Sequence, residues 1–215
     1  MTELILSPAE ARVLASLVEK SILTPQYYPM TVNAAMLAAN QKTVRNPVMS
    51  LSEGDTGAAL NGLERQRLVS RDESSSRAVK WRHQMQHQML LKPGELALLV
   101  TLMLRGPQTV SELRANAQPL GGPADADGVQ AALASLQDRA QPLVLELPRG
   151  AGQKEARQVH LLCGQPSPAL LAAAAAAAPP PRSAAESSAM AALEERLQAL
   201  ETRVAELERR LAPPG

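Results

Sequence analysis

The feature that most constrains the fold of this chain is a sparse internal repeat relating its first half to its second. Four positions recur at a constant offset: Pro8 as Pro93, Glu10 as Glu95, Leu14 as Leu99, and Leu17 as Leu102. In each half, three helical segments precede two short extended runs, which is the order of a winged-helix variant of the helix-turn-helix. The sequence therefore predicts a mainly α chain with small β-hairpins (α+β), with winged-helix domains over residues 1–90 and 91–165.

Capping signals mark where the helices begin. An N-cap Ser or Thr three residues before an acidic side chain predicts a capping box. We expect such a box at three helix starts: Ser7 with Glu10, Ser52 with Asp55, and Thr109 with Glu112. Thr31 is expected to cap a further helix. The stretches "LVSRDESSSRAVKWRH" and "PLVLELPRGAGQKEARQVHLLCG" each place extended runs around a polar or Gly-rich tip, which predicts two hairpins.

The remainder of the chain has a different composition. Residues 166–188 contain an Ala run and three consecutive prolines, and predict a linker. Residues 189–212 carry a heptad pattern, with the apolar a and d positions at Met190, Leu193, Leu197, Leu200, Val204, Leu207 and Leu211. Arg at g and Glu at e favour pairing of two parallel helices, so a homodimeric coiled coil is expected. The alternative is one amphipathic helix folded back on its own chain.

Composition excludes several classes of protein. A single Cys excludes an internal disulfide and fits a reducing compartment. No apolar run is long enough to span a membrane, and the N-terminus lacks the basic segment of a signal peptide, so we expect a cytoplasmic protein without membrane contact. The scarcity of aromatic residues disfavours single-strand binding by base stacking. The formal net charge of +1 lacks the basic surplus typical of nucleic-acid binders.

The residues that commonly carry catalysis do not form a recognisable constellation. His83 and His87 are four residues apart and would share a helix face as metal ligands can, but no third ligand is evident. His160 alternates with apolar residues and is expected to be a satisfied structural histidine. Cys163 is expected to be a small buried hydrophobe rather than a nucleophile. We therefore expect a protein that is not an enzyme and has no cofactor and no metal.

Double-stranded DNA is the leading candidate partner. A winged helix usually places its third helix in the major groove and its hairpin on the backbone, where Lys and Arg neutralise phosphates. The expected nucleic-acid or partner contacts in the first half are Asn40, Gln41, Lys42, Arg45, Arg65, Arg77, Lys80 and Arg82.

Acidic residues at the start of both third helices favour an alternative. Glu53 and Asp55 in the first half, and Asp125 and Asp127 in the second, suit the helix dipole but repel phosphate. A protein-interaction scaffold that does not read DNA is therefore the second hypothesis, with the second domain binding another protein. The "TPQYYP" stretch is expected to be a rigid loop with half-buried rings rather than an aromatic binding patch.

The stretch "NAAMLAANQKTVRNPVMSLSE", with "TPQYYPMTVN" before it, resembles the YceH family of bacterial proteins. "GQKEARQVHLLCG" in the second hairpin is also similar to the family pattern. The resemblance implies tandem winged helices with a C-terminal heptad segment, and it implies no activity. "QPLGGPADADG" departs from the aromatic and basic segment expected before the sixth helix, so no role for that segment carries over.

Overall fold

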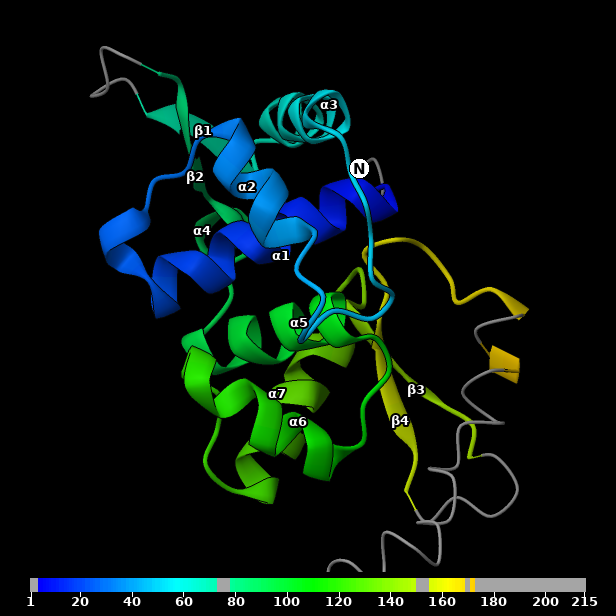
Figure 1. Cartoon of the computed structure of the whole chain (residues 1–215). Helices are drawn as coiled ribbons and strands as arrows, with labels where there is room; N and C mark the ends of the chain where they lie inside the picture. Colours follow the sequence, from blue (N-terminus) through cyan, green and yellow to red (C-terminus); the bar gives the residue numbers. More distant parts are fainter. Residues whose placement is uncertain (1–3, 73–77, 150–154, 169–170, 173–215) are drawn as a thin grey trace, which may run out of the picture. The chain divides into compact units, whose positions relative to one another are not determined.

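The first half of the chain consists of three helices followed by a hairpin. A computed structural model describes residues 4–72, 78–149, 155–168 and 171–172. The helices are α1 (Pro8–Leu23), α2 (Val32–Ala39) and α3 (Glu53–Arg65), with a short 3-10 turn, η1 (Pro25–Tyr27), after α1. Strands β1 (Val69–Asp72) and β2 (Lys80–His83) pair antiparallel, and the single turn α4 (Met85–Gln88) follows. Figure 1 shows this order of elements.

The second half repeats the same order. It comprises α5 (Pro93–Arg105), α6 (Val110–Ala117), the 3-10 turn η2 (Gln118–Leu120), α7 (Ala126–Gln137), and the antiparallel strands β3 (Val144–Leu147) and β4 (Arg157–His160). The expected mixture of α-helices with small hairpins is therefore confirmed. The capping boxes at Ser7, Ser52 and Thr109 are also confirmed, and Thr31 accepts a hydrogen bond from the Ala34 amide.

Both halves contain one pairing that the sequence did not predict. Met30, just before α2, exchanges backbone hydrogen bonds of 2.8 and 3.2 Å with Trp81 of β2. Gln108, just before α6, exchanges bonds of 2.7 and 3.1 Å with Gln158 of β4. A pairing that involves one residue is too short to show an alternating strand pattern in the sequence, so only the tertiary structure reveals these two pairings. Each hairpin is thereby tied to the start of its own second helix.

The core is continuous across the two halves. Helices α1 and α5 contact each other, and one apolar cluster contains buried residues of both, including Leu14 and Leu17 from α1 and Leu98 and Leu102 from α5. A backbone bond of 2.7 Å from Leu6 to Leu162 adds a further link. All described residues belong to one compact unit.

Part of the sequence prediction lies outside the described residues. The linker beyond residue 172, the heptad positions from Met190 to Leu211, and Arg77 are among the positions that the structure does not describe. The coiled coil and its homodimer therefore stay predictions.

Candidate functional site

The loop between α2 and α3 is closed by one asparagine. The Asn40 side-chain amide donates to the Leu51 carbonyl at 2.8 Å, and its oxygen accepts from the Leu51 amide at 2.8 Å. These two bonds fix the ends of the loop that carries Gln41, Lys42 and Arg45. Asn40, which we expected to contact a partner, therefore uses its polar atoms inside the molecule.

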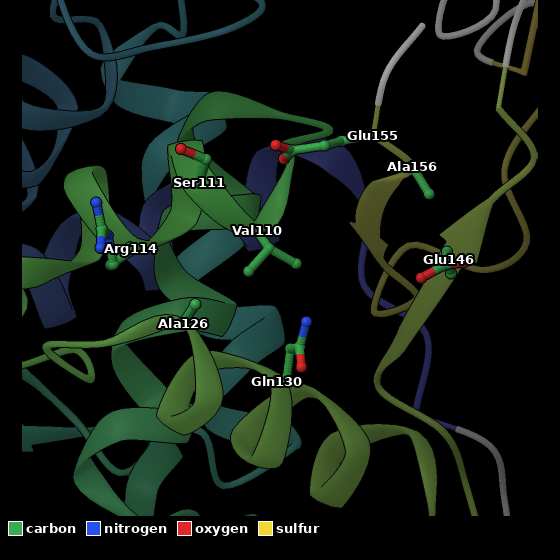
Figure 2. A pocket seen from close by; sticks show the side chains of 8 residues that line it. All are labelled: Val110, Ser111, Arg114, Ala126, Gln130, Glu146, Glu155 and Ala156. Carbon is green, nitrogen blue, oxygen red and sulfur yellow. The ribbon is translucent and has the colours of Figure 1, made fainter.

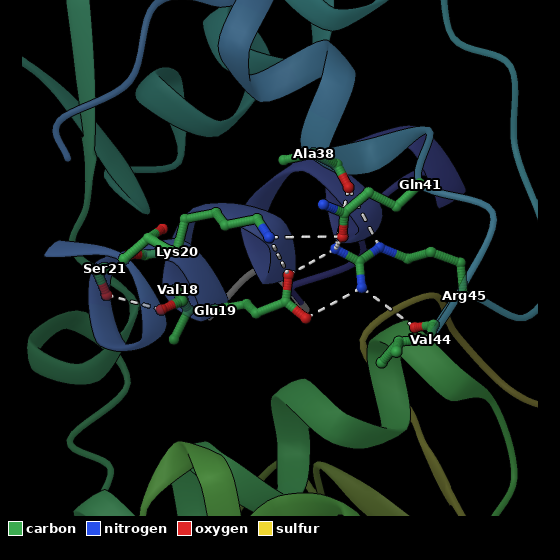
Figure 3. A network of polar contacts seen from close by, with 9 residues as sticks. Val18, Glu19, Lys20, Ser21, Ala38, Gln41, Val44 and Arg45 are labelled. Carbon is green, nitrogen blue, oxygen red and sulfur yellow. Dashed lines mark hydrogen bonds and ion pairs between the residues drawn. The ribbon is translucent and has the colours of Figure 1, made fainter. Parts of the chain in front are cut away.

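Arg45 is the centre of a buried network rather than a surface contact, so this prediction is wrong. Its Nη2 lies 2.6 Å from Oε2 of Glu19 and its Nη1 lies 3.1 Å from Oε1, giving a two-point ion pair between the loop and α1. The side chain of Arg45 is 0% exposed. Figure 3 shows the guanidinium also donating to the Ala38 carbonyl and to Gln41. A buried charge is stable only with such partners, which explains why Arg45 points inward.

Gln41 and Lys42 differ in whether their side chains form hydrogen bonds inside the molecule. The Gln41 side-chain oxygen accepts from Arg45 at 3.0 Å and from Lys20 at 3.5 Å, so it belongs to the buried network. Lys42 is exposed, and in the described part of the chain its side chain has no ion pair or hydrogen bond. Of the four predicted contacts in this loop, Lys42 is the one free to meet an anionic partner.

A second group of cations surrounds α3 and the first hairpin. We call it the hairpin cations, and it consists of Arg65, Arg71, Lys80 and Arg82. Arg65 is exposed and Lys80 is half-buried, and within the described residues neither has an ion pair. Arg82 lies 2.8 Å from Asp72, and its guanidinium stacks 5.8 Å from the Tyr28 ring.

Arg71 was absent from the sequence prediction. Its Nη2 lies 3.0 Å from Glu64 and 3.3 Å from Asn61, both on α3, and its guanidinium stands 5.1 Å from the Trp81 ring. The side chain is still 51% exposed, so it remains open to solvent. The available sequence signal was its place in the first extended run of the predicted hairpin, and the structure sets it opposite Trp81 in the strand register. The hairpin cations therefore extend from the end of α3 across the hairpin.

The first turn of α3 is negative, as the sequence predicted. Glu53 and Asp55 are exposed, and Ser52 caps the helix. Hydrogen bonds from the Ser52 side chain and backbone lower the pKa of Asp55, so its carboxylate stays charged. A phosphate at this helix end would meet two negative charges.

The histidines do not form a metal site within the described residues. His83 ends β2 whereas His87 lies on α4, so the expected shared helix face is wrong. Burial lowers the pKa of His83 to about 4, and that of His160 also to about 4, so both rings are neutral at pH 7. His160 is not satisfied as expected, because its buried Nδ1 has no hydrogen-bond partner among the residues that the structure describes.

Two further expectations need correction. Cys163 is exposed rather than buried, and desolvation of its thiol, with a smaller effect of Glu10, raises its pKa. A raised pKa makes the thiol a weak nucleophile at neutral pH. The tyrosines differ from each other: Tyr28 is half-buried as expected, whereas Tyr27 is 73% exposed.

The second half offers a different surface. A hollow of about 410 Å³ lies between α6, α7 and the second hairpin. Figure 2 shows Arg114 on one side, and Glu146 and Glu155 on the hairpin side. Two carboxylates against one guanidinium make this hollow a poor phosphate site.

The fold and these surfaces define a mixed α+β protein of two similar halves, one with a cationic hairpin and one with an acidic hollow. The chain belongs to the family described as "Protein of unknown function, DUF480", whose model matches residues 6–153. It is 46% identical over 211 residues to a UPF0502 protein of Mesorhizobium japonicum, covering 98% of this chain and 97% of that protein. It is 45% identical over 203 residues to a UPF0502 protein of Azoarcus sp., covering 94% of this chain and 89% of that protein.

A UPF0502 protein of Geobacter sulfurreducens is 43% identical over 164 residues, covering 76% of this chain and 75% of that protein. The expected family of bacterial proteins is confirmed in this coarser form, DUF480 with its UPF0502 relatives, and the YceH name stays an expectation. Among the described residues, every helix is too short or too polar to cross a bilayer.

Proposed function

We propose that each half of the chain is a winged helix and that the first half binds double-stranded DNA without catalysing a reaction. The winged-helix assignment rests on a bridge that occurs in both halves. It joins the segment just before the second helix to the hairpin, Met30 to Trp81 and Gln108 to Gln158. It adds a one-residue β-bridge beside the two-stranded hairpin of each half, which supports a winged helix in each.

The DNA part rests on the hairpin cations. Their position at the end of α3 and on the hairpin suits contact with the sugar–phosphate backbone on either side of a groove. The acidic first turn of α3 and its small exposed residues, Gly54 and Ala58, offer little for reading bases. The proposed binding is therefore electrostatic and weakly dependent on sequence, with Lys42 as an additional contact.

The test is a fluorescence anisotropy titration of a labelled DNA duplex at low and moderate salt. Binding through phosphates predicts an affinity that falls steeply as salt rises, because condensed counterions are released from the duplex. Absence of binding at low salt would reject the proposal.

A heptad-mediated homodimer would present two such surfaces and raise the avidity. Deleting the residues after Ser188 should then halve the mass seen by light scattering, and an unchanged mass would contradict pairing through the tail.

A second function, a protein-interaction scaffold, is favoured by the acidic hollow of the second half. Asp125 caps α7 and Asp127 lies in its first turn, near the hollow that contains Glu146 and Glu155. This surface suits a basic segment of a protein partner. A partner recovered by the wild-type chain and lost by an Asp125→Lys, Asp127→Lys variant would support the scaffold. Equal recovery by both chains would contradict it.

A further inference from the structure

A pocket of about 530 Å³ lies where α1, α5, the loop before α3 and the segment after β4 meet. Its walls are mainly apolar: Pro8 and Ala11 from α1, Leu102 and Met103 from α5, and Val159 from β4. Pockets of this volume that combine apolar walls with a few polar groups are typical of small-molecule sites.

Arg12 supplies an unbalanced positive charge at this pocket. It is 3% exposed, and its guanidinium donates to the Pro47 carbonyl at 2.7 Å and to the Ala39 carbonyl at 3.4 Å. Its Nε is buried, and no described residue forms a hydrogen bond with it. In the described part of the chain no carboxylate forms an ion pair with it. Carbonyl dipoles alone compensate a buried charge only in part.

The neighbouring charges do not neutralise Arg12. Desolvation and the nearby positive charge of Arg45 lower its pKa, and the carboxylate of Glu19 is already paired with Arg45. Glu10, two residues earlier on α1, accepts hydrogen bonds from the Ser7 amide and from the Gln66 side chain. An additional anion in the pocket would therefore be attracted by Arg12.

His160 also lines the pocket, so its ring provides a second polar group, and its buried Nδ1 has no hydrogen-bond partner within the described ranges. Asn46 and Gln165 contribute further amides to the wall. The combination is one cation, one neutral imidazole and amide groups in an otherwise apolar hollow. That chemistry matches a molecule with one anionic end and a hydrocarbon body.

We propose that this pocket binds a small carboxylate with an apolar body, attracted by the guanidinium of Arg12 and oriented by His160. The binding is distinct from DNA binding and does not depend on it. Because the walls come from both α1 and α5, a bound molecule contacts both halves of the chain.

Cys163 provides a direct measure of occupancy. It is the single Cys of the chain, it is exposed, and it lines the same pocket. Alkylation of the full-length protein by N-ethylmaleimide would be followed with octanoate or 3-phenylpropionate present. The matched controls are octan-1-ol and 3-phenylpropan-1-ol, which have the same hydrocarbon bodies without the charge.

We expect the carboxylates to protect Cys163 at concentrations about tenfold lower than the alcohols, the ratio that one charge-assisted interaction supplies. An Arg12→Gln variant should lose this preference, whereas Arg149→Gln, a change at an exposed position, should keep it. Equal protection by acids and alcohols in the wild-type protein, or no protection by either, would overturn the proposal. That comparison needs no variant, so it stands even if Arg12→Gln fails to fold.

Discussion

Arg45 and Glu19 form a two-point ion pair in which the cation is completely buried, with Nη2–Oε2 and Nη1–Oε1 distances of 2.6 and 3.1 Å. The pair joins the loop before α3 to the C-terminal part of α1. The same guanidinium donates to the carbonyls of Ala38 and Val44, so one side chain fixes the path of the loop (Figure 3). This loop places Lys42 at the surface and forms part of the wall of the Arg12 pocket.

Breaking this pair should strongly destabilise the protein. Glu19→Gln leaves the buried charge of Arg45 without its counter-ion, which typically costs about 3–5 kcal/mol. Urea unfolding followed by circular dichroism would measure the change. The matched control is Glu64→Gln, which breaks the more exposed pair with Arg71 and should cost about 1 kcal/mol or less. Similar losses in both variants would contradict the structural role of the Glu19 pair.

Relief of backbone strain beside Arg45 should have the opposite effect. Val44 has φ of 62°, which is unfavourable for a β-branched residue, and its side chain is exposed. Val44→Asn should stabilise the protein by about 1 kcal/mol, because Asn tolerates this conformation. Val48→Asn, at an exposed site without a positive φ, is the control. Thermal unfolding would compare them, and a lower melting temperature for Val44→Asn than for Val48→Asn would count against strain.

Stability should fall as pH falls from about 6.5 towards 4. Burial lowers the folded-state pKa of His83 and of His160 to about 4, whereas a histidine in the unfolded chain has a pKa near 6.5. The unfolded chain therefore binds more protons in this window, and stability rises with pH until about 6.5 and then levels off. Each histidine contributes at most about 1.4 kcal/mol per pH unit.

The measurement is urea unfolding at pH 7.5, 6.5 and 5.5. A His83→Gln, His160→Gln variant should show a smaller loss between pH 6.5 and 5.5 than the wild-type chain. His87→Gln, a change at an exposed position, is the comparison: it removes only the smaller charge effect on the pKa of His83, so its loss should lie closer to that of the wild type than to that of the double variant. If the double variant also follows the wild type, these two rings do not control the pH dependence.

The salt dependence of DNA binding should identify the cations that contact phosphate. Reversing two of the hairpin cations, in Arg65→Glu with Lys80→Glu, should reduce the slope of log affinity against log salt by about 2. Lys92→Glu with Arg149→Glu makes the same charge change at exposed positions of the second half. Anisotropy titrations at several salt concentrations give both slopes. Equal slopes for the two variants would show that net charge, rather than the hairpin surface, governs binding.

Local chemistry in the sequence determined the helix starts, because a capping box involves residues only three apart. Ser7 with Glu10 and Thr109 with Glu112 therefore occur as predicted. The hairpins followed from extended runs on either side of a polar tip. The sequence alone also predicted the acidic first turn of α3, since exposure of Glu53 and Asp55 follows from their place in a capped helix.

Only the tertiary structure decided which cations are free. Arg45 and Lys42 are both cations and lie three residues apart in one loop, yet Arg45 is buried because Glu19, distant in sequence, lies within reach of its guanidinium. Arg12 is similarly enclosed by carbonyls of the residues around that loop. Whether a charged side chain meets water or protein depends on contacts between segments far apart in the chain, and residue type and helical period do not encode those contacts.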